Sequence, residues 1–121
     1  MLAMFIETYA DPTGTLTLAI DRAEDGTVSI GFAGFPWHVH PCLLTGEFGA
    51  TDEAATEGFK DAVLGNRLVI AIVRKAKEII HVSITGCPDT EADGLPDGEE
   101  LELRYWNGSR WTSGDPTLPF G

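Results

Sequence analysis

Apolar residues alternate with small or polar residues along several short segments of this chain, and a period of two is typical of half-buried β-strands. The alternation is clearest on either side of Asp25-Gly26. An Asp-Gly step readily adopts the positive φ angles of a hairpin turn. We therefore predict a β-hairpin over residues 14–33. The segment Phe5–Tyr9 before it is a further predicted strand.

A second hairpin is predicted later in the chain. Arg67–Val73 is almost entirely apolar, which is typical of a strand that is covered on both faces. Apolar residues alternate with other residues again within Glu78–Thr85. The basic turn at 74–77 separates the two segments, so we expect them to pair with each other.

A third hairpin is predicted at Asn107-Gly108, because this dipeptide favours a tight turn between two strands. The predicted strands are Leu101–Trp106 and Ser109–Thr112. The ten residues from Leu103, Leu-Arg-Tyr-Trp-Asn-Gly-Ser-Arg-Trp-Thr, are similar to a short Leu-Arg-Tyr-Trp-Asp-Gly-x-x-Trp-Thr module of actinobacterial proteins of unknown function. The resemblance implies no function. The tryptophans either pack across the hairpin or form an aromatic binding surface.

Residues 52–64 form the one segment with a clear helical period. Thr51 can cap the amino end of this helix, and Gly65-Asn66 favours its carboxyl end. The apolar face consists of Ala55, Phe59, Ala62 and Val63. Gly58 weakens a helix by about 1 kcal/mol relative to alanine. We expect this glycine to allow a close approach of the helix to a sheet.

The order of these elements predicts an α+β fold, a mostly antiparallel β-sheet built from hairpins with one amphipathic α-helix packed on a face. The chain has 121 residues, of which 43% are hydrophobic, and this favours one folded domain over residues 1–121. Residues 114–121 form a proline-rich tail that we expect to be extended.

Acidic residues outnumber basic residues by 19 to 8, which sets the formal net charge at −11. Such a chain has no general electrostatic attraction for DNA, RNA or anionic lipid. We therefore expect no nucleic-acid partner and no membrane partner. A basic protein or a cation is the natural complement of this charge.

The amino end and the cysteines favour a cytoplasmic protein. The first residues lack the basic region of a signal peptide, and no apolar run reaches the roughly 20 residues that span a bilayer. Cys42 and Cys87 are far apart in the sequence, and we expect both thiols to be reduced. Cys42 precedes two leucines, which favours a small buried side chain at this position.

The acidic residues are densest in the connection between the second and third predicted hairpins. Seven acidic residues fall within 89–102: Asp89, Glu91, Asp93, Asp97, Glu99, Glu100 and Glu102. The plainest interpretation is a solvated turn between strands. The second is a calcium loop, because residues from Asp89 to Glu100 follow most of the EF-hand pattern, although strands rather than helices flank them. The third is an anionic surface for a cationic partner, formed by the first six of these residues.

His38 and His40 are the candidate metal ligands. On an extended chain their side chains point to the same side, and zinc, copper or iron could use them. Cys42 or His81 could supply a third ligand. The His-x-His spacing resembles that of the cupin family, but the glutamate and the later histidine of the cupin pattern are missing. The competing interpretation is that both histidines make hydrogen bonds near a sheet edge, because two histidines alone do not fill a tetrahedral shell.

The sequence contains no nucleophile motif and no phosphate-binding loop, so we expect a protein without enzymatic activity and without a cofactor. The leading hypothesis is a protein-binding module that engages a basic partner. Immunity proteins, which neutralise basic toxins, resemble this chain in size and charge. The alternatives are a metal-binding protein or small metalloenzyme that uses His38 and His40, and a module that self-associates through edge strands and the aromatic hairpin.

Overall fold

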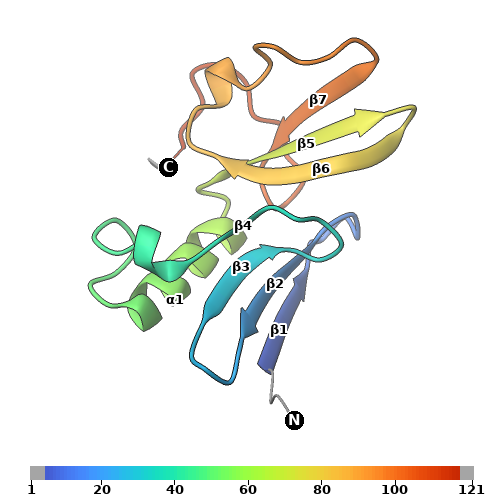
Figure 1. The fold of residues 1–121 in the computed structure, drawn as a ribbon. Helices are drawn as coiled ribbons and strands as arrows, with labels where there is room; N and C mark the ends of the chain where they lie inside the picture. The colour runs from blue at the N-terminus through green and yellow to red at the C-terminus, as the bar shows by residue number, and fades with distance from the viewer. Residues whose placement is uncertain (1–4, 118–121) are drawn as a thin grey trace.

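The strands form two antiparallel sheets, and a helix packs on the first sheet (Figure 1). The computed structural model describes residues 5–117. The first sheet has the order β1-β2-β3-β4, with β1 (Phe5–Ala10), β2 (Thr17–Arg22), β3 (Val28–Phe32) and β4 (His38–Val39). The second has the order β6-β5-β7, with β5 (Val69–Lys75), β6 (Glu78–Thr85) and β7 (Glu99–Arg104). The predicted α+β class is confirmed.

The first sheet contains the first predicted hairpin. β2 pairs with β3 from Leu18 opposite Phe32 to Arg22 opposite Val28, and β1 adds the predicted strand before them. Pairing ends at β4, which is two residues long. Pro36 and Pro41 flank this strand, and proline lacks the N–H group that would extend the ladder. The strands therefore divide between two sheets rather than forming the single sheet that we expected.

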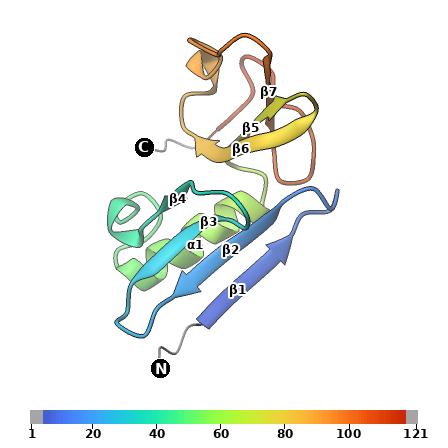
Figure 2. The ribbon, with the colours of Figure 1, turned by 45° about the vertical axis from the view of Figure 1, so that its right-hand side comes forward.

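The helix α1 (Asp52–Leu64) has the predicted bounds, and Figure 2 shows it behind β2 and β3. The Thr51 hydroxyl accepts a hydrogen bond from the Ala54 N–H at 3.1 Å, as expected of a cap. Gly58 approaches a loop and not a sheet. A Cβ atom at this position would lie 2.0 Å from the backbone oxygen of Phe48. The helix does make a close approach at Gly58, but the expectation that its partner would be a sheet was wrong, because the partner is the loop at Phe48.

One hydrophobic cluster joins both sheets and the helix. Leu18 and Ile30 of the first sheet, Phe59 of α1, and Ile70 and Val82 of the second sheet all belong to it, and all five are fully buried. Burial of such side chains stabilises a fold by about 1.5–3 kcal/mol each. The two sheets are therefore held by a shared core.

β5 is the central strand of the second sheet, and both of its faces are covered, as the sequence predicted. Val69 to Ile72 are each at most 1% exposed. The turn from β5 to β6 places Ala76 and Lys77 at φ angles of 52° and 71°. Glycine or asparagine usually occupies such positions, because a Cβ atom is strained there.

The third hairpin is only partly formed, which corrects the prediction. β7 ends at Arg104, and its return partner is reduced to one bridge between Arg104 and Arg110. The predicted strand Ser109–Thr112 does not continue beyond this bridge, and Asp115 binds its far end. The Asp115 carboxylate accepts hydrogen bonds from the Thr112 N–H and hydroxyl, each at 2.9 Å. The tight turn itself is present at Gly108, whose φ angle is 94°.

Residues 114–117 of the predicted tail contain no helix or strand, and residues 118–121 lie outside the described part of the chain. The Tyr105 hydroxyl donates to the backbone oxygen of Pro116 at 2.6 Å, which holds this segment beside the second sheet. Between residues 5 and 117, no helix is both long enough and apolar enough to cross a lipid bilayer.

Candidate functional site

The predicted partner-binding residues lie in the connection between β6 and β7, at the top of the second sheet in Figure 1, and in the first two positions of β7. We call the following six residues the acidic connection: Asp89, Glu91, Asp93, Asp97, Glu99 and Glu100. A short 3-10 helix, η2 (Pro88–Thr90), begins the connection, and β7 ends it. Glu91 and Glu99 are half-buried, and the other four side chains are exposed.

The carboxylates of the acidic connection make few contacts with the rest of the chain. Glu91 accepts a hydrogen bond from the Thr85 hydroxyl at 2.7 Å, and Asp89 accepts one from the Ser113 hydroxyl at 3.5 Å. Among residues 5–117, no member of the connection forms an ion pair. The seventh acid of this stretch, Glu102, differs because it pairs with Arg74.

The calcium-loop hypothesis gains no support from the arrangement of the described residues. Successive turns link Thr90 to Cys87, Asp93 to Thr90 and Leu95 to Ala92 through backbone hydrogen bonds of 3.0–3.2 Å. In the described part of the chain, no three His, Cys, Asp or Glu residues are placed to hold a metal ion. A calcium site needs several converging oxygen ligands.

His38 and His40 lie side by side at β4, as expected for alternate residues of a strand. Their ring centroids are 5.0 Å apart with an interplanar angle of 79°. Nδ1 of His38 is 3.0 Å from the backbone oxygen of Pro36, and Nδ1 of His40 is 2.7 Å from that of Val28. A carbonyl oxygen only accepts hydrogen bonds, so each Nδ1 is the donor, and in the neutral imidazole Nε2 then has a lone pair. β4 is the edge of its sheet, where the hydrogen-bonding interpretation placed these histidines.

The other candidate ligands do not join the histidine pair to form a metal centre. Cys42 is exposed rather than buried, whereas Leu44, two residues later, belongs to the core. Cys42 and His40 line a hollow of about 490 Å³ that also reaches the first turn of α1. Cys87 is exposed as well, and both thiols are free. His81 lies on β6 in the second sheet, opposite Val73.

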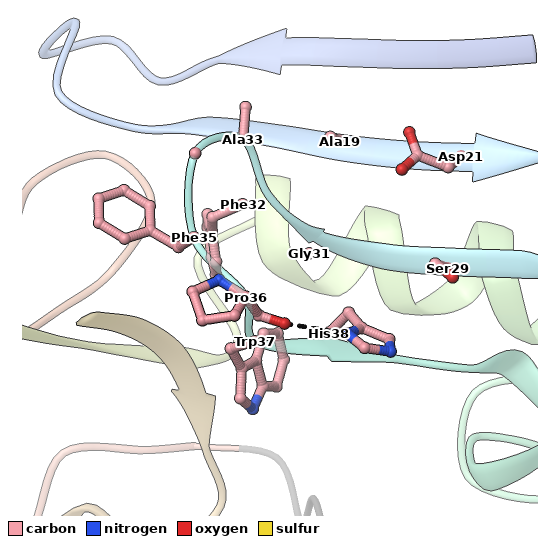
Figure 3. Close-up of a pocket in the computed structure, with 11 residues that line it drawn as sticks. Ala19, Asp21, Ser29, Gly31, Phe32, Ala33, Phe35, Pro36, Trp37 and His38 are labelled. Carbon is pink, nitrogen blue, oxygen red and sulfur yellow. Dashed lines mark hydrogen bonds between the residues drawn. The ribbon is translucent and has the colours of Figure 1, made fainter. Parts of the chain in front are cut away.

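A pocket of about 300 Å³ lies on the face of the first sheet opposite to α1 (Figure 3), and sequence reasoning did not predict it. We call it the sheet-face pocket. Its floor consists of small or polar residues from β2 and β3: Ala19, Asp21, Ser29 and Gly31. Its wall is formed by residues 32–38. A Cβ atom on Gly31 would lie 2.5 Å from the backbone oxygen of Trp37, so glycine at the floor permits the close approach of the wall.

A buried ion pair between Asp11 and Arg104 also escaped sequence reasoning. The Asp11 side chain is fully buried, and that of Arg104 is 4% exposed. The Asp11 carboxylate also accepts hydrogen bonds from the Thr15 N–H at 3.0 Å and the Thr13 hydroxyl at 3.0 Å. Burial by itself raises the pKa of Asp11, but the hydrogen bonds from Arg104, Thr15 and Thr13 outweigh it and hold the pKa below its ordinary value of 3.8.

The Leu-Arg-Tyr-Trp-Asn-Gly segment makes contacts that support the fold. Arg104 is buried in the ion pair, and Trp106 is 5% exposed within the core. The Asn107 N–H donates to the side-chain oxygen of Asn66 at 2.8 Å. The Trp111 indole N–H donates to the backbone oxygen of Asp115 at 3.1 Å. These contacts favour the packing interpretation of the segment.

The fold and these sites define a small α+β protein with an exposed acidic connection, a histidine pair at a sheet edge and a pocket on one sheet face. Comparison of the chain with protein-family models, with curated proteins and with solved structures finds no match in any of the three. Its function is therefore inferred from the site residues themselves.

Proposed function

We propose that this chain is a non-enzymatic cytoplasmic protein that binds a basic protein partner through the acidic connection. The observation that carries the proposal is a contrast in charge pairing. Four of the eight basic residues, Arg22, Lys60, Arg74 and Arg104, are paired with carboxylates outside the connection. Within the described residues, the six carboxylates of the connection have no such partner, although Glu99 lies opposite Lys75 across the β5–β7 register.

A cationic surface on another protein would supply the missing counter-charges. The net charge of −11 attracts such a partner over a longer range than direct contact. Complementary charge of this kind raises the association rate and selects between partners. Immunity proteins that neutralise basic toxins are one class with this size and charge, and a basic toxin domain is the partner that this likeness suggests.

The proposal is tested by measuring association rates with a basic protein encoded beside this chain. We expect the rate constant to fall at least about tenfold between 25 and 500 mM salt, because salt screens the attraction. The triple variant Asp97→Asn/Glu99→Gln/Glu100→Gln should lower the rate at low salt by a similar factor.

A matched control removes three charges elsewhere on the surface. Glu47→Gln/Asp61→Asn/Glu78→Gln replaces three exposed acids outside the acidic connection. This control should reduce the rate much less than the first triple variant. Equal effects of the two variants, or binding that is indifferent to salt, would contradict the proposed surface.

Metal binding through His38 and His40 is a second candidate function, which we retain because of one observation. The backbone hydrogen bond of each Nδ1 orients the ring and leaves Nε2 available, which is how proteins commonly orient a histidine ligand. Calorimetric titration with Zn²⁺ tests this candidate. Binding should disappear in His38→Gln/His40→Gln and persist in the control His81→Gln. Heats that are unchanged in the double variant would eliminate the candidate.

A further inference from the structure

The sheet-face pocket contains one formally charged residue, the acidic Asp21. No lysine or arginine lines the pocket. Among residues 5–117, the Asp21 carboxylate takes part in no ion pair, although its side chain is half-buried. Ser29 lies directly opposite Asp21 in the register of β2 and β3 and adds a hydroxyl group beside it. A half-buried carboxylate without a counter-ion favours a cationic ligand.

The opposite side of the pocket is formed by the loop that joins β3 to β4. Phe35, Pro36 and Trp37 belong to this wall, and Figure 3 shows the rings of Phe35 and Trp37 turned away from Asp21. His38 completes the wall at the end nearer to Ser29, with its Nδ1 bound to the backbone oxygen of Pro36. The pocket thus combines one carboxylate and a hydroxyl group on its floor with a wall of loop residues.

The size of the pocket limits what can enter it. Ligand pockets usually measure about 300–1,000 Å³, and this one, at about 300 Å³, is at the lower end. A single side chain suits this volume better than a drug-sized molecule. The guanidinium group of arginine is planar and can donate two parallel hydrogen bonds to a carboxylate, whereas the ammonium group of lysine is a point charge.

We propose that the sheet-face pocket receives an arginine side chain of the basic protein partner, with the guanidinium group on Asp21 and beside the hydroxyl group of Ser29. This inference rests on the proposed function, because it assigns to the same partner a specific anchor beside the general attraction of the acidic connection. Buried arginines in pockets are common sites of high binding energy at protein interfaces.

The test uses N-acetyl-arginine-N-methylamide as the probe and two-dimensional NMR of the full chain as the readout. We expect shift changes at the amides of Ser29, Gly31 and His38. The citrulline analogue has nearly the same shape without the charge and should bind roughly tenfold more weakly, because the charged hydrogen bonds are lost. Asp21→Asn should weaken the arginine probe by a similar factor, whereas the control Asp61→Asn on the exposed face of α1 should not.

A second variant keeps the test decisive if Asp21→Asn disturbs folding. Ala19→Leu leaves the carboxylate in place but fills the floor of the pocket, and it should also abolish the shift changes. Equal binding of arginine and citrulline, or shift changes confined to residues 89–100, would overturn the inference. A basic partner that binds the wild-type chain and Asp21→Asn equally well, yet loses affinity for the triple variant of the acidic connection, would refute the arginine site and leave the proposed function intact.

Discussion

Asp11 and Arg104 connect two parts of the molecule that are 93 positions apart in the sequence. Asp11 follows β1 in the first sheet, and Arg104 ends β7 in the second. Removal of two charges from water is costly, and a buried pair recovers this cost only when further hydrogen bonds satisfy it. Asp11 has such bonds from Thr13 and Thr15. The buried Nε atom of Arg104 has no hydrogen-bond partner among the described residues. The pair therefore specifies how the sheets meet more than it adds to stability.

We predict that Asp11→Asn destabilises the protein by about 3 kcal/mol, because it leaves the Arg104 charge buried without a counter-ion. The double variant Asp11→Asn/Arg104→Met removes that charge as well and should recover more than half of the loss. The free energy of unfolding from urea titration measures both effects. If the losses of the two single variants simply add in the double variant, the two residues are not energetically linked.

The lowered pKa of Asp11 predicts how this contribution depends on pH. A carboxyl group whose folded pKa lies below its unfolded pKa stabilises the fold above the unfolded value, and the contribution is lost as pH falls through the folded value. The difference in unfolding free energy between the wild type and Asp11→Asn should be constant above about pH 5 and should shrink below about pH 4. A difference that grows on acidification would contradict the prediction.

Within single elements, the turn between β5 and β6 contains two residues whose side chains strain the backbone conformation that the turn requires. Ala76 and Lys77 both adopt positive φ angles. We predict that Ala76→Asn/Lys77→Gly stabilises the protein by about 1 kcal/mol, because these residues suit a turn of this kind. The control Lys75→Gly, in the neighbouring strand, should destabilise by about 0.5–1 kcal/mol. Thermal unfolding distinguishes the two directions.

In helix α1, a substitution at Gly58 should have the opposite effect on stability. Alanine there would improve helix propensity by about 1 kcal/mol, yet its Cβ atom would overlap the backbone oxygen of Phe48. We predict a net loss of about 1–3 kcal/mol for Gly58→Ala. The exposed control Asp61→Ala should change the unfolding free energy by less than about 0.5 kcal/mol. A stabilised Gly58→Ala protein would show that the loop moves away without cost.

Sequence reasoning was most successful where an element depends on its own neighbours. The helix was predicted with the bounds that it has, because its cap, its apolar face and its end signal all lie within 51–66. The third hairpin failed although Asn107-Gly108 is a strong turn signal. Trp106 enters the core, and Asp115 binds Thr112 three positions before it, so these contacts compete with the preference for a second strand.

For the whole molecule, the net charge of −11 opposes the compact state through self-repulsion. We predict that the midpoint of thermal unfolding rises by a few degrees from 10 to 300 mM salt, because salt screens this repulsion. The triple variant of the acidic connection removes three negative charges and should show a smaller rise. An unfolding midpoint that is independent of salt in both proteins would contradict this account.

The candidate sites show the same division between local and distant information. The sequence placed His38 and His40 on one side of a strand, because alternation is a local property. It located the dense acidic segment, because charge is counted along the chain. It did not locate the sheet-face pocket, since this pocket needs β2, β3 and the loop before β4 to be brought together in one register.

The sequence by itself therefore determined the α+β class, the first two hairpins, the helix and the position of the densest negative charge. Each of these depends on residues a few positions apart. Only the tertiary structure decided that the strands form two sheets, that Arg104 meets Asp11 and that Gly58 lies against Phe48. Those features depend on which distant surfaces fit together, and the energy of that fit comes from close packing and from satisfying buried polar groups, neither of which can be read from a local pattern.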